Sequence, residues 1–316
     1  MRVFVAGATG TVGTEVVREL LVRGHEVVGM SRSDSRRASL ERLGAEAVVA
    51  DALDRASVAR VVSEARPEGV VSVLTSLPRT GPRRAKDLEP TNRLRDEGTR
   101  NVLEAAVAAG ARRFVGESMI VTYGFGPRRS PALEDEPLAH EDDVGLERVV
   151  AAAGAGEGHV RAATEAGRIE GASLRFGFYH GGRAPSTQYM LRMVRRRMLP
   201  LIGGGHAVHS WIELSDAARA VADCLERAEP GSVYNVVDDE PVEFREYLSE
   251  MARITGAKRP LSVPYGLARL AMPYAALFFS RAQVPASNAR LKRELGWRPQ
   301  VPTYRDALLH LLPLPP

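Results

Sequence analysis

Three glycines near the start of the chain are spaced for binding a phosphate group. Gly7, Gly10 and Gly13 form the pattern G-x-x-G-x-x-G between a strand-like run and a helix-like run. The first glycine permits a tight turn, the second lets the backbone approach a pyrophosphate, and the third lets the helix pack closely on the strand. The alternative is an ordinary strand-to-helix turn, but amides at a helix start suit a dinucleotide, which we expect here. The remaining residues expected to bind it within this turn are Thr9, Thr11 and Val12.

The end of the second strand indicates which nicotinamide cofactor to expect. Proteins that bind NAD commonly carry an acid here, which hydrogen-bonds the ribose and would repel the 2′-phosphate of NADP. Ser31 and Arg32 occupy this place, and an arginine can bind that phosphate through charge-assisted hydrogen bonds. We therefore predict NADP in preference to NAD. A solvated Arg32, with Asp34 on the ribose, would favour NAD instead.

Short apolar runs alternate with helix-like patterns through the first half of the chain. This alternation predicts an α/β fold, a doubly wound Rossmann arrangement with a mainly parallel sheet covered by helices on both faces. We expect residues 1–175 to form the dinucleotide-binding domain, and 176–316 mainly a smaller substrate lobe, partly interleaved with the sheet. The expected strands are 3–6, 26–30, 47–49, 69–74, 113–116, 172–175 and 233–237, and the expected helices include 39–43, 55–65 and 98–109.

Charge and cysteine usage exclude several classes of protein. The formal net charge is only +4 despite a pI near 9.4. Basic clusters such as Arg195-Arg196-Arg197 lack interleaved aromatic residues for stacking on bases, so we expect no nucleic-acid partner. The single cysteine, Cys224, excludes a disulfide framework, and we expect a cytoplasmic protein.

Membrane and metal sites are not expected either. The most lipophilic stretch, 267–279, contains Arg269 and Pro273 and is too short to span a bilayer, so it predicts a buried helix pair. His206 and His209 follow three glycines, but no third ligand recurs at a spacing suitable for a metal ion.

Several segments together resemble the extended and atypical short-chain dehydrogenases, often called the NAD-dependent epimerase/dehydratase family. They follow that family's order over nearly the whole chain, so the resemblance implies the same Rossmann fold. The segments are GATGTVG at 7–13, VVADALD at 48–54, GTRNVLEAA at 98–106, RRFVGESMIVTYG at 112–124, LRFGFYHGG at 174–182, VYNVVDDEP at 233–241 and LKRELGWRP at 291–299.

The resemblance also implies cofactor contacts beyond the glycine turn. Residues at the matching positions follow the carboxyl ends of strands, where ligands bind in parallel sheets. The adenine would meet Asp51 and Ala52, the nicotinamide ribose would lie along Leu74, Thr75 and Ser76, and the nicotinamide would lie beside Glu117 and Ser118 with Phe176 and Gly177 on its other side.

The catalytic residues of that family are largely missing. Its acid–base group is the tyrosine of Y-x-x-x-K, where the lysine lowers the pKa of the phenol. None of the lysines at 86, 258 and 292 follows a tyrosine by four positions. Because further family positions are also replaced, sugar-nucleotide epimerisation is not the expected reaction. The replacements are Arg95 and Phe178 for asparagines, Met119 for a serine, His209 for an arginine that grips a sugar-nucleotide phosphate, and Glu213 for a histidine.

Three residues are candidates for the missing chemistry. Ser118 could donate a hydrogen bond to a substrate carbonyl, and an inward Arg95 would place a fixed cation beside a developing oxyanion. His140 adjoins Ala139, which aligns with the lost tyrosine, and has a usable pKa. Each has a plainer interpretation, in which Ser118 bonds only to backbone and the other two are solvated. Tyr123 keeps the family's Y-G pair and is expected to pack.

These features predict an NADP-dependent oxidoreductase that acts on a small carbonyl, alcohol or related metabolite. Hydride would pass between nicotinamide and carbon, with Ser118 or Arg95 polarising the oxygen and an unusual donor or water supplying the proton. The first alternative is a non-catalytic NADP-binding redox sensor or regulator, which would keep the glycine turn and lose the tyrosine and lysine. The second is an epimerase or isomerase. We expect a small-molecule substrate and a monomer or homodimer.

Overall fold

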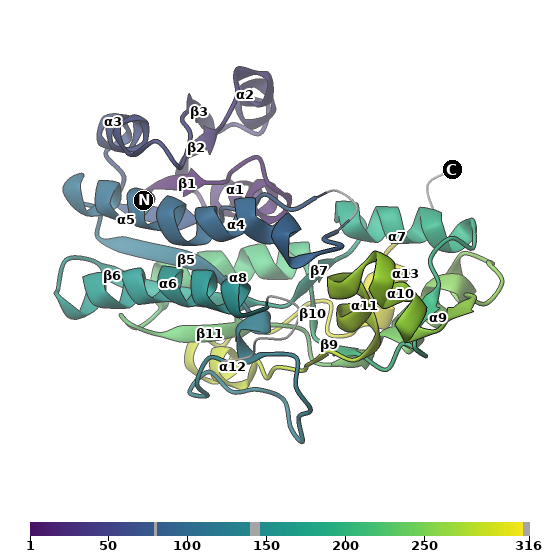
Figure 1. The fold of residues 1–316 in the computed structure, drawn as a ribbon. Coiled ribbons are helices and arrows are strands. Elements are labelled where there is room, and N and C mark those ends of the chain that lie inside the picture. The colour runs from purple at the N-terminus through teal and green to yellow at the C-terminus, as the bar shows by residue number, and fades with distance from the viewer. Residues whose placement is uncertain (79–80, 140–145, 312–316) are drawn as a thin grey trace.

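A seven-stranded parallel sheet lies at the centre of the molecule (Figure 1). The computed structural model describes residues 1–78, 81–139 and 146–311. In spatial order the strands are β11 (Val233–Val236), β6 (Glu170–Phe176), β5 (Arg113–Met119), β4 (Gly69–Ser72), β1 (Arg2–Ala6), β2 (Glu26–Ser31) and β3 (Glu46–Val49). The chain proceeds from β1 to β3 in one direction and from β4 to β11 in the other. The predicted doubly wound Rossmann arrangement is therefore confirmed.

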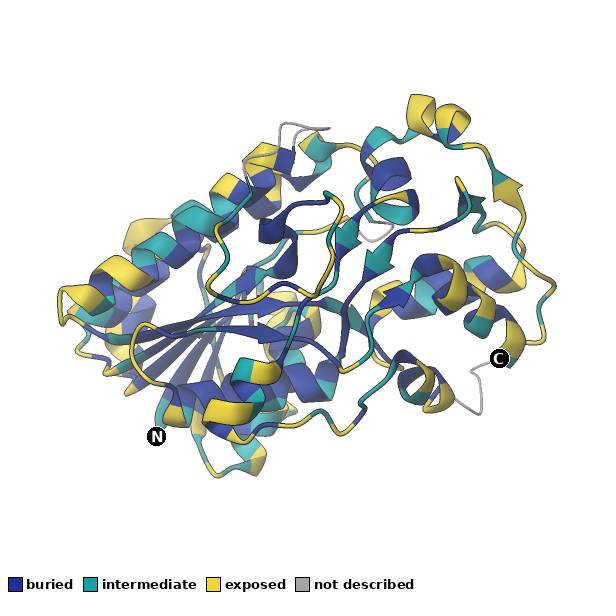
Figure 2. Ribbon diagram, turned by 90° about the horizontal axis from the view of Figure 1, so that it is seen from below, coloured by how far each residue is buried: buried dark blue, intermediate teal, exposed yellow. Residues whose placement is uncertain are grey.

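Alternate residues of each central strand point to opposite faces of the sheet, and helices cover both faces (Figure 2). On β1, Val3 and Val5 pack with side chains of α1 (Thr11–Val22) and α8 (Leu214–Arg227). Phe4, between them, packs on the opposite face. Burial on both sides explains why these strands are continuous apolar runs in the sequence. The helices of the second face are α3 (Arg55–Ala65), α5 (Thr99–Ala108) and α6 (Leu146–Glu165), while α2 (Asp34–Glu41) packs beside α1 through Leu40.

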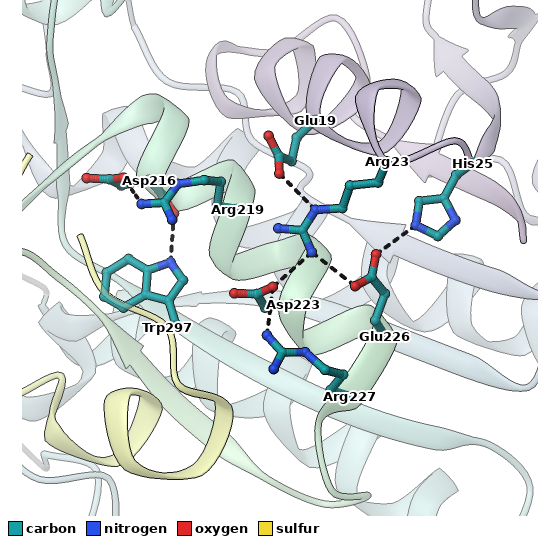
Figure 3. A network of polar contacts seen from close by, with 9 residues as sticks. All are labelled: Glu19, Arg23, His25, Asp216, Arg219, Asp223, Glu226, Arg227 and Trp297. Atoms are coloured by element: carbon teal, nitrogen blue, oxygen red, sulfur yellow. Dashed lines mark hydrogen bonds and ion pairs between the residues drawn. The ribbon is translucent and has the colours of Figure 1, made fainter. Parts of the chain in front are cut away.

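A polar network joins α1 to α8 across the first face (Figure 3). The guanidinium of Arg23 donates to Glu19 at 2.8 Å, to Asp223 at 2.8 Å and to Glu226 at 3.0 Å. The ring of His25 lies 2.9 Å from the second carboxylate oxygen of Glu226. The network holds α8 against β1 and α1, although about 190 residues separate α1 from α8 in the sequence.

A lobe beside the sheet has its own apolar core, built mainly from residues that follow β6. The core also contains Ile120, Val121, Tyr123 and Phe125, which follow β5, whereas β11 returns from the lobe to the sheet. The two parts are therefore interleaved, and the division at 175/176 stays a prediction. The lobe contains β7 (Phe178–His180), α7 (Pro185–Arg195), β8 (Leu201–Ile202), β9 (Val208–His209), β10 (Trp211–Glu213), β12 (Val242–Glu243), α9 (Phe244–Ile254), β13 (Ser262–Val263), α10 (Tyr265–Ala271), α11 (Pro273–Ser280), β14 (Gln283–Val284), α12 (Ala289–Leu295) and α13 (Tyr304–Leu309).

Several predicted bounds were wrong: the helix expected at 39–43 is α2, which begins at Asp34 and ends at Glu41, and the strand expected at 113–116 continues to Met119. β4 ends at Ser72 rather than at Leu74, because its neighbour β1 turns away from the sheet at Gly7. The stretch 267–279 does form two helices, but only α11 is buried; Leu267 and Leu270 of α10 are exposed. Within the described parts of the chain, no helix combines the length and apolar character needed to cross a bilayer.

Candidate functional site

The glycine turn joins β1 to α1 at the carboxyl edge of the sheet. Gly7 has a φ of +87°, and a Cβ there would lie 2.4 Å from the carbonyl oxygen of Val73. A Cβ on Gly13 would lie 2.0 Å from the carbonyl oxygen of Gly7, so both positions require glycine. The amide of Gly10 donates to the same Gly7 oxygen at 2.8 Å and closes the turn.

The residues within the turn differ in exposure. Thr9 is half-buried, Thr11 is exposed, and Val12 is buried in the core beneath α1. Gly10 caps α1 without a side chain, so the amides of the first helical turn stay open to an anionic ligand. The turn has the shape expected for a pyrophosphate, while its contact with one stays a prediction.

A cavity of about 430 Å³ opens beside the end of β2. Arg32 and Asp51 line it from the segments that follow β2 and β3. Lys86, from the 3₁₀ turn η1 (Ala85–Leu88), and Arg93, from α4 (Glu89–Arg93), line it from the segment after β4. Three cations and two carboxylates therefore line the same space, and the guanidinium of Arg93 is paired with Glu97 at 3.0 Å. The cavity is completed by Leu53, Ser76, Glu89, Pro90 and Leu94.

Two predicted cofactor residues support this cavity rather than line it. Ser31 is buried, and its hydroxyl donates to the carbonyl oxygen of Ser33 at 3.1 Å, a local turn that presents Arg32 outward. Ala52 is also buried, and its carbonyl oxygen accepts a hydrogen bond from the Asn101 amide at 2.9 Å. They hold the backbone next to Arg32 and Asp51.

The residues predicted to follow the nicotinamide half lie at the ends of three strands, β4, β5 and β6. Leu74 is buried, Thr75 is half-buried, and the amide of Ser76 donates to the Thr91 hydroxyl at 2.9 Å. Phe176 is buried at the end of β6. A Cβ on Gly177 would lie 2.8 Å from the carbonyl oxygen of Ser210, so this glycine allows close packing inside the lobe.

Glu117 and Gly7 lie at the same level of the sheet, each one residue beyond a row of paired residues that crosses β1, β4 and β5. Ala6 pairs with Ser72, and Ser72 pairs with Gly116, so Gly7 and Glu117 both come one residue after this row. Two strand spacings, about 10 Å in all, separate them along the edge of the sheet. Glu117 therefore lies where a dinucleotide seated on the turn would extend.

Arg95 faces Glu117 from a helix. The side chains of Arg95 and Glu117 are 4% and 6% exposed, and Nη2 of Arg95 lies 3.8 Å from Oε1 of Glu117. Arg95 belongs to a π-helical turn, η2 (Leu94–Gly98), between α4 and α5. Such turns re-aim side chains and are frequent at functional sites. The interpretation of Arg95 as a solvated arginine is wrong, because the side chain is buried.

Several buried polar atoms in and beside the Arg95–Glu117 pair have no hydrogen-bond partner among the described residues. These atoms are Nε and Nη1 of Arg95, Oε2 of Glu117 and the hydroxyl of Tyr179 on β7. Burial raises the pKa of Glu117 to about 7 even though the charge of Arg95 opposes the rise. Tyr274 of α11 lies close enough to interact electrostatically with Arg95. The cluster can therefore donate and accept further hydrogen bonds.

Ser118 belongs to a different buried network. Its hydroxyl donates to Oε1 of Glu157 at 2.6 Å, and Arg175 holds both oxygens of that carboxylate at 2.8 and 2.7 Å. Arg175 also donates to the hydroxyl of Tyr123 at 2.8 Å, and this hydroxyl donates to Asn235 at 2.8 Å. Tyr123 is thus held as a packed structural residue, and the catalytic role of Ser118 stays a prediction.

The two candidate histidines that the structure describes, His206 and His209, lie outside the Arg95 cluster. His140 lies outside the described residues. His209 is buried and stacks on Phe278 with ring centroids 4.4 Å apart, and His206 is largely exposed. Among the described residues, no group of three or more histidine, cysteine, aspartate or glutamate side chains is placed to hold a metal ion.

Four residues of the site were not identified from the sequence. Lys86 and Arg93 follow the fourth strand at positions without a fixed spacing to the glycine turn. Tyr179 lies two residues after Gly177, in a segment already matched to the family, so the strand period could have indicated it. Tyr274 had no such signal, because α11 reaches the site only through the fold of the lobe.

The observed features fit a nicotinamide dinucleotide. The cavity at β2, the crowded glycines after β1 and the unpartnered atoms at β5 follow one another in this order along the carboxyl edge of the sheet. A dinucleotide has an adenosine end, a central pyrophosphate and a nicotinamide end, in that order. The site therefore offers a place for each part.

A sequence model of the NAD dependent epimerase/dehydratase family matches residues 3–237. The chain is 37% identical to a 3-diazoavenalumate denitrifying reductase from a Streptomyces species, over 98% of this chain and 99% of that protein. It is 25% identical to a 4-hydroxy-2-methyl-3-oxo-4-farnesyl-3,4-dihydroquinoline-1-oxide ketoreductase of Stigmatella aurantiaca, over 98% and 95% of the two chains.

Among solved structures, the UDP-glucose 4-epimerase of Thermus thermophilus in complex with NAD is similar throughout. Its TM-score is 0.80 at 24% identity, and the match covers 98% of each chain. At this identity the likeness concerns the fold. It places the doubly wound sheet and the lobe of the present chain in an architecture that is already known.

Proposed function

Since the chain belongs to the NAD-dependent epimerase/dehydratase family, we propose that it is an NADP-dependent reductase that acts on a small carbonyl compound or the corresponding alcohol. The family and the reductases among its relatives support an NAD(P)-dependent oxidoreductase. The choice of NADP, the substrate class and the residues named below are our proposals.

One observation carries the proposal. At the end of β5 the buried guanidinium of Arg95 keeps two nitrogens, Nε and Nη1, without partners among the described residues. Unsatisfied buried donors are costly unless a ligand completes them. A guanidinium remains charged at working pH, so it would stabilise negative charge on a substrate oxygen.

The cations around the β2 cavity support a preference for NADP. Arg32 and Lys86 would bind the 2′-phosphate, with Arg93, which is shared with Glu97, beside them, while Asp51 would lie toward the adenine. The turn from Gly7 to Gly13 would hold the pyrophosphate. When bound, the reduced cofactor supplies a hydride to the substrate carbon. The residues of this chain bind and orient the substrate, and Arg95 polarises the oxygen that becomes the alcohol.

Aromatic rings beside the cluster favour a planar substrate over a sugar nucleotide. Tyr274 stacks with Phe278 at 6.2 Å between ring centroids, and Phe278 lies 4.8 Å from Phe178. Phe178 and His209 stand where the family has an asparagine and a phosphate-gripping arginine. Their rings offer an apolar wall and no second buried cation for a diphosphate.

A second candidate is the reductive removal of a diazo group, which the whole-length similarity to the denitrifying reductase favours. In that reaction the carbon–nitrogen bond breaks, its electron pair leaves with dinitrogen, and a hydride provides the pair of the new carbon–hydrogen bond. No oxyanion forms, so no tyrosine–lysine pair is needed. A sequence without Y-x-x-x-K agrees with this chemistry.

Deuterium transfer tests both candidates. The protein is incubated with NADPH deuterated on either the pro-R or the pro-S face of C4, and with a panel of aromatic aldehydes, ketones and an arenediazonium salt. We expect label from one face only on the new carbinol carbon. One-face labelling of the arene alone would favour the diazo reaction. Cofactor binding without face-selective transfer to any compound would support the non-catalytic alternative.

A further inference from the structure

Two buried arginine–glutamate pairs involve consecutive residues of β5, Glu117 and Ser118. They differ in how many hydrogen bonds the glutamate accepts. Glu157, beneath Ser118, receives two hydrogen bonds from Arg175 and one from the Ser118 hydroxyl. Glu117 has Arg95 at 3.8 Å, a distance too long for a hydrogen bond. The first pair is closed and structural, whereas the second stays open.

The surroundings of Glu117 favour its protonated form. The charged or titratable side chains that face it are Arg95 from η2, Tyr179 from β7 and, through Arg95, Tyr274 from α11. Among the described residues nothing donates a hydrogen bond to its Oε2. A buried carboxylate without donors pays the full cost of desolvation, and this raises the pKa of Glu117 to about 7. Near neutral pH the carboxyl is thus present in both forms.

We propose that Glu117 is the proton donor of this site, in place of the family's tyrosine. The proposal rests on the proposed carbonyl reduction. As hydride from the reduced nicotinamide dinucleotide forms the carbon–hydrogen bond, the carbonyl π pair moves onto oxygen. The O–H bond of Glu117 breaks, its proton passes to that oxygen, and the carboxylate formed lies beside Arg95 until water returns a proton.

Tyr179 and Ser118 are less suited to this step. Burial, together with the nearby Glu117, raises the pKa of Tyr179 well above its ordinary value, so its hydroxyl is a weak acid. The proton of the Ser118 hydroxyl is held by Glu157 at 2.6 Å. Tyr179 can instead orient the substrate oxygen by a hydrogen bond. Among the described side chains beside Arg95, burial raises the pKa of both tyrosines, Tyr179 and Tyr274, and only the pKa of Glu117 lies near neutral pH.

Titration of the ligand-free protein tests the inference without turnover. The carboxyl signals of ¹³C-glutamate-labelled protein are followed by NMR, and Glu117→Gln identifies the signal of Glu117. We expect an apparent pKa near 7 for this carboxyl, and a higher one in Arg95→Met, because the arginine charge favours the carboxylate. Arg60→Met, which removes an exposed arginine of α3, should leave the pKa of Glu117 unchanged. Titration near the ordinary value of about 4.3 would overturn the inference.

Kinetics provide the second arm. In the direction of reduction, kcat should fall as the pH rises through the pKa of Glu117. Glu117→Gln should lower kcat about a hundredfold or more, flatten this limb and keep NADPH affinity, while Glu117→Asp should restore part of the rate and the limb. A Glu117→Gln variant with the wild-type dependence of kcat on pH would overturn the role of Glu117 but not the proposed function. Absence of deuterium transfer in the wild-type protein would overturn the proposed function as well.

Discussion

Arg95 and Glu117 face each other at 3.8 Å in the interior, although one lies on a helix before β5 and the other at the end of that strand. The carbonyl oxygen of Arg95 lies so close to α6 that a Cβ on Gly156 would approach it to 2.7 Å. The π turn and this tight contact hold the guanidinium in place. A rigid cation beside an incompletely bonded carboxyl is suited to chemistry rather than to stability.

Arg95→Met tests whether the cation acts on the substrate. Methionine keeps most of the buried volume and removes the charge. Turnover should fall about a hundredfold or more, the size of effect seen when a stabiliser of an oxyanion is lost. NADPH affinity, measured by calorimetry, should change little, because the sites that we propose for the 2′-phosphate and the pyrophosphate lie elsewhere.

The matched control for this variant is Arg100→Met on the same helical segment. Arg100 is exposed, so the change removes the same charge without touching the cluster. Equal kinetics for Arg95→Met, Arg100→Met and the wild-type protein would refute a role for Arg95 in turnover.

Arg32→Ala tests the choice of cofactor. Loss of one charge-assisted phosphate contact weakens binding by about 1–3 kcal/mol, which is about 5- to 150-fold in Kd. We expect this loss for NADPH and nearly none for NADH, since NADH has no 2′-phosphate. Arg36→Ala is the control, because Arg36 is exposed on α2 and does not line the cavity. An equal loss for both cofactors would contradict the assignment.

The fold was predictable because its signals are local. Buried parallel strands are apolar runs of strand length, and the glycine spacing marks the first βα turn without any knowledge of the rest of the chain. The end of β4 was misplaced because Val73 and Leu74 are as apolar as the strand residues before them. Only the departure of the neighbouring strand at Gly7 ends the pairing.

The site was predictable in part. The strand order brought Glu117 and Ser118 to the correct edge, and the helix brought Arg95 near it. Which residue of β5 meets Arg95 and which meets Glu157 depends on the π turn and on α6, neither of which has a sequence signature here. Tyr274 arrives through lobe packing, which is a property of the whole fold.

Tyr123→Phe tests the structural role of the tyrosine that keeps the Y-G pair. The variant removes a hydroxyl that bonds Arg175 and Asn235, and burial raises the pKa of Tyr123 to about 12. Unfolding by urea should show a loss of about 1–3 kcal/mol, with kcat changed by less than about tenfold. Tyr179→Phe should leave the free energy of unfolding nearly unchanged, because its hydroxyl has no partner among the described residues, and should lower kcat more than Tyr123→Phe does. A thousandfold loss of kcat in Tyr123→Phe would show that it is catalytic.

The buried histidines of the lobe should make the protein sensitive to acid. Burial lowers the pKa of His180 and of His209 to about 3, whereas an unfolded histidine titrates near 6.5. The unfolded state therefore binds more protons below pH 6.5, and stability is lost as the pH falls from 6.5 toward 3. For one such group the loss reaches about 2 kcal/mol at pH 5.

His209→Phe separates this effect from the other titrating groups. The phenyl ring can keep the stack on Phe278, although the hydrogen bond to the Phe278 carbonyl oxygen at 3.1 Å is lost. Relative to the wild-type protein, the variant should therefore gain about 2 kcal/mol between pH 7.5 and pH 5, measured by urea unfolding at each pH. Glu117 acts in the opposite direction, because its raised pKa favours the folded state at lower pH, but it is common to both proteins and cancels. His206→Phe, at an exposed position, should show no such gain. A His209→Phe difference that stays constant from pH 7.5 to pH 5 would mean that this ring is protonated in the folded protein, and that the packing around it admits the charge.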